Sequence, residues 1–370
     1  MAKEDSKTTK KSLKDRIKEA STISTTSMLM DSKVFGKKEM YQTTVPMINV
    51  ALSGQVDGGL SPGFTYITGA SKNFKSGFTL MMVSAFLKKK PDGVVLFYDS
   101  EFGTPEAYFD SFGINKDQVI HTPITNIEEL KFDITAQLAN FEREDDVIIV
   151  IDSIGNLASR KEASDAAEQN SAADMTRAKE LKSLFRILTP HLSIKDIPLV
   201  CVGHVYQTME LYAKTIVSGG TGPYLSADTI WILSRAQETE GSGSDKELTG
   251  YRFTIKIEKS RFVKEGSKIP VTVSFDGGIK RWSGLVEEAM DAGYIVKPKV
   301  GWYAKADPET GEVLSKNYRL AEIEDDDDFW KDMFKTTKLA SLINTKYVLN
   351  SSGMNLSGDA IEFQEEAVDA

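Results

Sequence analysis

The sequence has little cysteine or histidine and no long apolar run. Its 370 residues contain one cysteine, Cys201, and three histidines that lack the spacing of metal ligands. One cysteine cannot form an intramolecular disulfide, and its place in the apolar run 197–203 predicts a buried small side chain. No run approaches the roughly 20 apolar residues that cross a bilayer, and the first 16 residues lack the apolar stretch of a signal peptide. These absences favour a soluble protein of a reducing cytoplasm, with no membrane partner.

Positive charge is also in the minority. The chain has 45 lysines and arginines against 54 aspartates and glutamates, which gives a formal net charge of −9. A protein coated in nucleic-acid-binding charge would have the opposite balance, although the net value does not exclude a local basic patch. Much of the negative charge falls in the run 322–328 and in the tail from Asp359. Such runs are typical of a solvated surface, and we expect the last dozen residues to be disordered.

Apolar strands alternate with helices from about Met47 onward. Continuously apolar strands separated by helices predict an α/β fold with a mostly parallel central sheet. We expect the later strands, which polar turns separate, to be antiparallel. Strands are predicted at 64–68, 94–98, 147–151, 198–202, 229–233, 253–257 and 271–275, and helices at 77–89, 127–141 and 174–188.

The two ends of the chain differ from this middle part. Leu13 and Ile17, four residues apart among charges, predict a short amphipathic helix over 12–20. Such a helix needs a neighbouring subunit or the chain's own core to cover its apolar stripe. Near Ser283 the pattern changes to short helices and acidic loops. We therefore predict an N-terminal oligomerisation segment over 1–33, a core domain over 34–283, and a small C-terminal domain with an acidic tail over 284–370.

A phosphate-binding loop is predicted between the first strand and the first long helix. Gly69, Lys75 and Ser76 have the spacing of G-x-x-x-x-G-K-[ST]. The backbone N–H groups would cradle phosphates, Lys75 would reach the β/γ oxygens, and Ser76 would ligate Mg²⁺. Phe74 replaces the usual second glycine, so either the loop geometry differs or backbone strain is tolerated. The alternative is a lysine-rich turn. The predicted nucleotide-binding residues here are Gly69, Ser71, Lys72, Asn73, Phe74, Lys75, Ser76 and Gly77.

Two further predicted strands end in carboxylates. Asp152 follows the apolar strand 147–151, where a carboxylate can hold water-bridged Mg²⁺ at the carboxyl edge of the sheet. Asp99 and Glu101 follow the strand 94–98, and one of them could polarise an attacking water as a general base. Each could by itself be an ordinary turn carboxylate. Catalytic residue types at three strand ends of one sheet instead predict an ATPase site that uses ATP and Mg²⁺.

A histidine follows a fourth predicted strand. The strand 198–202 ends in Gly203 and His204 at the same edge of the sheet. At that place His204 could hydrogen-bond a γ-phosphate and report its loss to the loop that follows. A structural or surface histidine is the alternative.

These motifs resemble those of the RecA-type recombinases. The resemblance is carried by LFYDSEFG at 96–103, IIVIDSIGNL at 148–157, GHVYQTMELYAKTIVSGGTG at 203–222 and LVEEAMDAGYIVKPKVGWYAK at 285–305. It runs from about Met47 to Ala304.

Within that family the sequence is similar to the tailed-phage UvsX-type recombinases. Phe74 stands where RecA has glycine, and His204 stands where RecA has glutamine. The last sixty or so residues resemble the family weakly. The segments LKDRIKEAST, ALSG, SKNFKSGF and ADMTRAKELKSLFRI extend the closer match toward both ends.

The resemblance implies a RecA-like P-loop ATPase that forms a helical filament on single-stranded DNA and exchanges strands with homologous duplex DNA. It would serve recombination, repair and recombination-dependent replication in the cytoplasm of a phage-infected bacterial host. A single-strand-binding protein and a recombination mediator would be its partners. ATP would lie between subunits.

Several site residues follow from the resemblance by position. Glu101 matches the hydrolytic base, Tyr108 the residue that stacks on adenine, and His204 the γ-phosphate sensor. Lys259 and Arg261 match the basic pair that a neighbouring subunit inserts toward the γ-phosphate. Their alternate spacing on a strand puts both on one face, as a two-point charge clamp needs. Two solvent-facing charges of an edge strand are the alternative.

Two loops at the sheet edge match the DNA-binding loops of the family. The first spans about 159–173, and the second spans 205–220. Paired glycines allow backbone N–H groups to approach phosphate, and apolar residues can wedge between bases. Two disordered surface loops are the alternative, because so few charges give modest affinity. The predicted DNA-binding residues are Arg160, Lys161, Arg177, Met209, Tyr212, Lys214, Gly219 and Gly220.

Three other functions are compatible with the same core. A ring-forming replicative helicase would unwind duplex DNA and have a different N-terminal domain. A small-molecule or nucleoside kinase would need an acceptor pocket and an arginine-rich lid, and the sequence shows neither. A regulatory RecA-like protein would bind ATP without strand exchange, and Phe74 is compatible with it, whereas Glu101 indicates competent hydrolysis.

Overall fold

A nine-stranded sheet forms the centre of the computed structural model, which describes residues 11–36, 38–168, 175–209, 214–240 and 246–349. Its strand order is β11-β10-β9-β8-β1-β5-β4-β2-β3. The strands from β3 to β8 are parallel, and β9, β10 and β11 continue the sheet in antiparallel pairing, as the sequence predicted. The strands are β1 (Gly63–Gly69), β2 (Val94–Asp99), β3 (Val119–Pro123), β4 (Val147–Asp152), β5 (Pro198–Gly203), β8 (Thr229–Glu240), β9 (Glu247–Ser260), β10 (Lys268–Ser274) and β11 (Gly278–Ile279).

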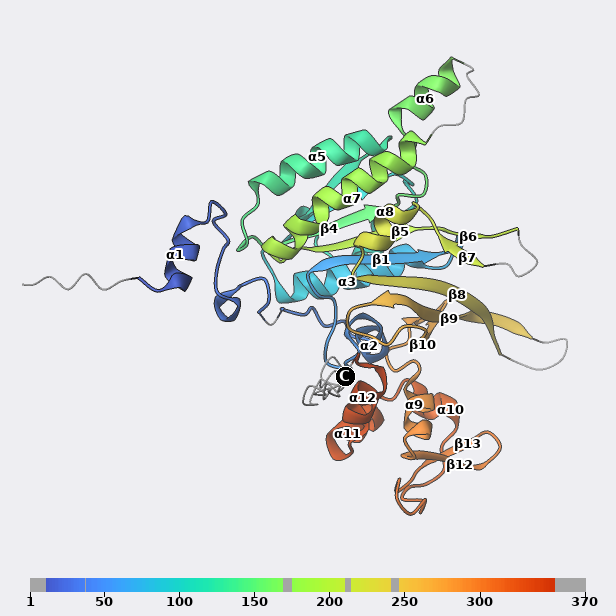
Figure 1. The fold of residues 1–370 in the computed structure, drawn as a ribbon. Coiled ribbons are helices and arrows are strands. Elements are labelled where there is room, and N and C mark those ends of the chain that lie inside the picture. The colour runs from blue at the N-terminus through green and yellow to red at the C-terminus, as the bar shows by residue number, and fades with distance from the viewer. Residues whose placement is uncertain (1–10, 37, 169–174, 210–213, 241–245, 350–370) are drawn as a thin grey trace, which may run out of the picture.

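Helices cover both faces of this sheet (Figure 1). Alternate residues of β4 enter two separate buried clusters, with Ile148 and Val150 in one and Ile149 and Ile151 in the other. Helices α5 and α7 pack on the second cluster, whereas α2 and α3 pack on the first. Cys201 is fully buried, as predicted. The helices are α2 (Pro46–Ser53), α3 (Lys75–Lys89), α5 (Ile127–Asn140) and α7 (Thr176–Lys195).

The main departures from the predicted elements lie at their ends. The helix expected to end at Leu188 continues through Pro190 to Lys195, because Leu188 and Leu192 keep its apolar stripe buried against the sheet. The strands expected at 229–233 and 253–257 are the apolar parts of β8 and β9, whose pairing continues into polar sequence.

The C-terminal elements share a buried cluster with the core. Trp330 is fully buried and donates its indole N–H to Ile323 O at 2.7 Å. The acidic run 322–328 is partly paired with the end of the core, since Asp327 accepts hydrogen bonds from Trp282 Nε1 (2.8 Å) and Arg281 (2.9 Å). The domain bounds at 33/34 and 283/284 stay predictions, and the acidic tail lies outside the described residues. The elements are α9 (Leu285–Asp291), β12 (Ile295–Lys299), β13 (Trp302–Lys305), α10 (Leu320–Glu324), α11 (Asp327–Thr336) and α12 (Leu339–Tyr347).

The N-terminal segment stands apart from the sheet (Figure 1). The predicted helix is α1 (Leu13–Ala20), which begins at the N-cap Ser12, and none of its residues is buried. Leu13 and Ile17 are 63% and 59% exposed, so their apolar stripe has no cover within the described part of the chain. Among the described residues, no helix combines the length and apolarity that a membrane crossing needs.

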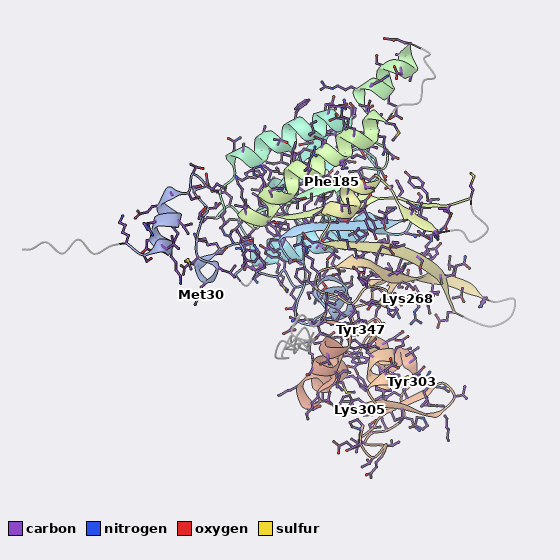
Figure 2. The ribbon with its side chains drawn as sticks, in the orientation of Figure 1. Met30, Phe185, Lys268, Tyr303, Lys305 and Tyr347 are labelled. Atoms are coloured by element: carbon purple, nitrogen blue, oxygen red, sulfur yellow. The ribbon has the colours of Figure 1, made fainter. Side chains whose placement is uncertain are left out.

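Figure 2 contrasts the core with this segment through Phe185 of α7 and Met30. Phe185 is fully buried and stacks on Phe64 with ring centroids 4.7 Å apart. Phe185→Ala should lower the free energy of unfolding by about 3–5 kcal/mol, because it removes apolar surface and leaves a cavity. Met30→Ala is the control and should change it by less than about 0.5 kcal/mol, because Met30 is 98% exposed. Urea denaturation of both variants checks this, and equal effects would contradict it.

Candidate nucleotide-binding site

The predicted phosphate loop joins β1 to α3 and is fastened to the neighbouring strand β8. Asn73 Nδ2 donates to Leu233 O at 2.8 Å, and Arg235 donates to Lys72 O at 2.9 Å. Lys75 begins α3, and its Nζ donates to Ala70 O at 2.9 Å, within the loop itself. Burial lowers the pKa of Lys75, and the nearby Glu101 and Asp152 charges oppose this shift. The loop thus places a cation beside the N-terminus of α3, whose backbone N–H groups are suited to bind phosphate.

Phe74 keeps the backbone conformation that glycine usually provides at this position. Its φ of 56° and ψ of 26° lie in the left-handed region. For a residue with a side chain this costs about 1–2 kcal/mol. The Phe74 ring packs edge-on against Phe78, with centroids 5.5 Å apart, and lies 5.9 Å from Phe253. Of the two outcomes left open by the sequence, the structure therefore shows tolerated strain.

Gly77 makes room for that aromatic ring. A Cβ at Gly77 would lie 2.3 Å from Phe74 Cε1, which is closer than any normal contact. The Phe74 ring at the end of the loop therefore needs a glycine at position 77, in the first turn of α3.

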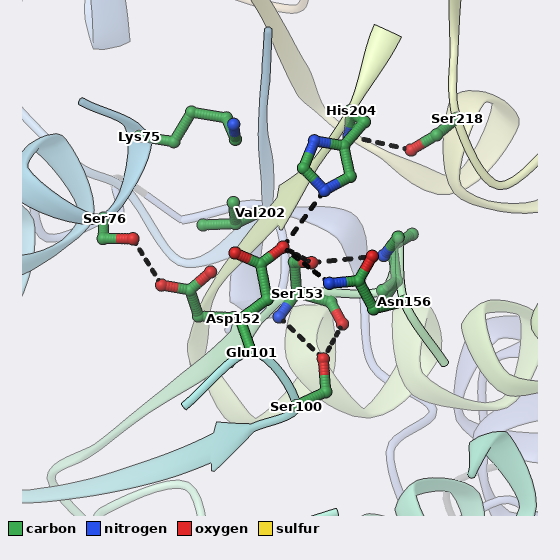
Figure 3. Close-up of polar contacts among 12 residues, drawn as sticks. Lys75, Ser76, Ser100, Glu101, Asp152, Ser153, Asn156, Val202, His204 and Ser218 are labelled. Carbon is green, nitrogen blue, oxygen red and sulfur yellow. Dashed lines mark hydrogen bonds and ion pairs between the residues drawn. The ribbon is translucent and has the colours of Figure 1, made fainter. Parts of the chain in front are cut away.

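Ser76 and Asp152 meet at the carboxyl edge of the sheet (Figure 3). The Ser76 hydroxyl donates to Asp152 Oδ2 at 2.6 Å. Asp152 Oδ1 is buried and has no hydrogen-bond partner among the described residues. Burial raises the pKa of Asp152 from 3.8 to about 6, and the charges of Glu101 and Asp99 add to the increase. A divalent cation would give Oδ1 a partner and offset this cost, so the hydroxyl and carboxylate fit Mg²⁺.

Glu101 and His204 lie together beside this pair (Figure 3). Glu101 Oε1 accepts a hydrogen bond from Ser153 Oγ at 2.6 Å and lies 3.0 Å from His204 Nε2. Asn156 Nδ2 approaches the same oxygen at 3.4 Å. Such a carboxylate can accept a proton from water while its neighbours fix its orientation. The predicted sheet edge thus brings Lys75, Ser76, Glu101, Asp152 and His204 into one site.

Asp99, the other carboxylate that the sequence offered as a general base, instead shapes the turn, because it accepts hydrogen bonds from the N–H groups of Glu101 (3.0 Å) and Phe102 (2.8 Å). Sequence reasoning missed three other residues that hold the Glu101–His204 pair. Ser218 Oγ accepts from the His204 N–H at 3.0 Å. Ser153 and Asn156 closely follow Asp152, so their place after the predicted strand end could have indicated them. The sequence gives no such indication for Ser218, because the conformation of its loop brings it to the site.

A cavity of about 640 Å³ lies next to the phosphate loop. Tyr108, on α4 (Glu106–Ser111), is 41% exposed and lines it, as a residue that stacks on a base should. Phe74 and Lys72 line the same cavity from the loop, so it adjoins the place where phosphates would bind.

Lys259 and Arg261 lie at the opposite end of the sheet. Lys259 is paired in register with Ile230 near the start of β8, and the Arg261 N–H donates to Asp228 O. Gly69, which begins the phosphate loop, is paired with Leu233 farther along that strand. In one chain the basic pair therefore does not face its own phosphate loop.

The described part of the first predicted DNA loop (159–168) is mostly helical, which corrects the expectation of a loop there. Residues Arg160–Ala167 form α6, because Ser159 and Glu162 make a capping box at its start. Arg177 donates to the carbonyls of Leu157, Ile154 and Gly155, which ties α7 to the turn after β4.

The second DNA loop is a short hairpin of β6 (Val205–Gln207) and β7 (Thr215–Val217). Met209 is fully exposed, and the Lys214 N–H donates to Thr208 within the hairpin. Gly219 and Gly220 have φ of 84° and 70°, which suits glycine. Tyr212 lies outside the described residues. The DNA contacts themselves stay predictions.

Known proteins share this sequence over most of its length. The recombination and repair protein of Enterobacteria phage T4 is 46% identical over 347 residues, which cover 93% of this chain and 88% of that protein. This chain belongs to the family of the T4 recombination and repair protein, UvsX. The family model for that protein's C-terminal domain matches residues 282–343. RecA of Borreliella burgdorferi (strain ZS7) is 23% identical over 266 residues, 69% of this chain and 70% of its own, and RecA of Gloeobacter violaceus is 24% identical over 272 residues, 73% and 71%.

Membership of the UvsX family fits the site and extends the resemblance. The chain is a RecA-family homologue with a RecA-like core, and this family implies ATP binding. The sequence suggested only weak resemblance over the last sixty or so residues. The family match continues to residue 343, so the resemblance there is stronger than expected.

The buried carboxylate of Asp152 should make stability depend on pH. Its pKa is higher in the folded than in the unfolded chain, so its contribution to stability is present below about pH 4 and is lost as the pH rises through 6. Asp152→Asn removes this titration. The stability of the ligand-free variant relative to wild type should therefore rise by on the order of 3 kcal/mol between pH 4 and 7. Denaturation curves across this range check it, and parallel pH profiles would contradict it.

Proposed function

We propose that this protein is an ATP-dependent DNA strand-exchange recombinase that forms a helical filament on single-stranded DNA. One observation carries the proposal. The predicted hydrolytic base Glu101 lies 3.0 Å from His204, and His204 is the residue directly before the predicted DNA-binding hairpin. In this proposal the residue that senses the nucleotide is therefore next in sequence to the hairpin that binds DNA.

The site residues have complementary roles in this proposal. Lys75 and the loop N–H groups bind the phosphates, and Ser76 and Asp152 hold Mg²⁺, which would neutralise charge developing on the phosphates. Glu101 accepts the proton of the attacking water, and Ser153 and Asn156 orient its carboxylate. His204 contacts the γ-phosphate region and moves the hairpin when that contact changes. Tyr108 stacks on the base.

Two further features support assembly into a filament. Lys259 and Arg261 lie away from their own phosphate loop, so they can complete only the site of a neighbour. Apolar side chains of the N-terminal segment are exposed, including Leu29 at 70% and Phe35 at 76%, and a neighbouring subunit would bury them. A contact between different surfaces of identical subunits produces a ring or a helix.

Glu101→Gln tests the hydrolytic assignment. The amide keeps the size of the side chain but cannot take a proton, so single-stranded-DNA-stimulated ATP hydrolysis should fall about 10²–10⁴-fold. Nucleotide binding should remain, because Lys75 and Ser76 are intact. Phosphate release and binding of a fluorescent ATP analogue measure the two effects. Glu106→Gln is the control, since Glu106 pairs with Lys116 on the surface and should retain full turnover.

Strand exchange distinguishes the recombinase from its alternatives. Filaments should exchange a single strand with homologous duplex DNA, and they should leave heterologous duplex intact. Hydrolysis without any DNA requirement, or unwinding without pairing, would favour a helicase. Nucleotide binding with neither activity would favour a regulatory protein.

A further inference from the structure

Asp228 joins two segments at the edge of the sheet opposite the phosphate loop. It lies between α8 (Thr221–Ser226) and β8. Its backbone N–H donates to Phe64 O at 2.8 Å, and its carboxylate Oδ2 accepts from the Phe64 N–H at 2.8 Å. Its carbonyl accepts from the Arg261 N–H at 3.1 Å. Asp228 is therefore fixed to the start of β1 and to the residue that follows β9.

The second carboxylate oxygen of Asp228 is directed at the Arg261 side chain. Asp228 Oδ1 lies 2.7 Å from Arg261 Nε. The Asp228 side chain is 14% exposed, whereas that of Arg261 is 69% exposed. Gly63 makes room for the carboxylate, because a Cβ there would lie 2.3 Å from Asp228 Oδ2. The acid is thus mostly buried and held by hydrogen bonds to Phe64, and the arginine that it holds is mostly exposed.

We propose that Asp228 is a positioning residue that holds Arg261 by Nε and directs its two terminal amino groups toward the nucleotide of a neighbouring subunit. The guanidinium is planar and carries five N–H donors. The carboxylate lies beside Nε, which anchors that side of the guanidinium and leaves both terminal nitrogens for bidentate binding of phosphate oxygens. This inference rests on the proposed function, in which Arg261 acts in trans.

Arg143, at the same sheet edge, shows the contrasting arrangement. Its terminal nitrogens are bonded to Asp196 and to the carbonyls of Ile194 and Lys33. They serve the chain's own structure. Among the described residues, the terminal nitrogens of Arg261 have no such partner, and only Nε is engaged. The terminal nitrogens of such an arginine can bind a ligand held by a neighbouring subunit.

Asp228 also balances the basic groups gathered at this edge. Lys259 Nζ donates to the carbonyls of Tyr224 and Leu225. Burial lowers the pKa of Lys259 and the Arg261 charge lowers it further, whereas Asp228 opposes both effects. Lys38 forms an ion pair with Asp196, and the nearby Asp228 charge also acts to raise its pKa against the lowering by burial. The acid therefore offsets part of the repulsion between Lys259 and Arg261 on one side of the sheet.

Steady-state ATP hydrolysis on single-stranded DNA tests the role through a double-mutant cycle. Asp228→Asn should reduce kcat about tenfold, since it removes the negative charge of the ion pair that holds Arg261, and should leave ATP-analogue binding unchanged. In the Arg261→Ala background it should cause no further loss. Glu287→Gln is the control, because it breaks the Glu287–Arg252 pair away from this edge and should retain wild-type kcat. Full activity of Asp228→Asn, or additive losses in the double variant, would overturn the inference.

Mixed filaments separate positioning from damage to the fold. Lys75→Ala subunits lack a working phosphate loop but offer an intact Arg261, and Asp228→Asn subunits have the reverse defect. A one-to-one mixture should therefore recover about a quarter of wild-type turnover per subunit, the fraction of contacts that pair two intact halves. No recovery would mean that Asp228→Asn damages its own nucleotide site, and the inference would fail. Full turnover of Arg261→Ala filaments would instead remove the trans role itself, and with it that part of the proposed function.

Discussion

Parallel pairing of the central strands is the constraint on which the candidate site depends. The register of β2 with β4 places Asp99 beside Asp152, and that of β1 with β5 places Thr68 beside Gly203. A slip of one residue would turn each side chain to the other face of the sheet. The register therefore brings residues distant in sequence to one edge. It also buries Asp152 and places other carboxylates near it, so burial first and the neighbouring charges second raise the pKa of Asp152, and a cation would stabilise the site.

The same strands separate the two halves of the proposed reaction site. The phosphate loop follows the carboxyl end of β1, whereas Asp228 and Arg261 lie at its amino end. The five residue steps from Phe64, which Asp228 contacts, to Gly69 span about 16 Å, more than a side chain can bridge. In the proposed filament a neighbouring copy would therefore supply Arg261, and assembly would be linked to hydrolysis by this geometry.

The sequence predicted those parts that depend on local pattern. Apolar runs located the interior strands, and the spacing of Gly69, Lys75 and Ser76 located the loop, because these features need only neighbours in the chain. Ser218 and Asp228 could not be predicted, since each acts through a loop or turn whose path is set by tertiary packing. The helical form of 160–167 is different, because its capping-box residues Ser159 and Glu162 are readable in the sequence even though the family resemblance implies a loop there.

Phe74 shows how a departure from a motif can keep the motif's geometry. The left-handed backbone that glycine adopts freely is held here by aromatic packing, with Phe78 and Phe253 fixing the ring and Gly77 leaving space for it. Such contacts can offset a conformational cost of about 1–2 kcal/mol. They also make the loop part of the hydrophobic core, and they place an aromatic wall on the cavity that Tyr108 lines. Phe74 therefore alters the wall of this cavity while the loop keeps its left-handed backbone at this position.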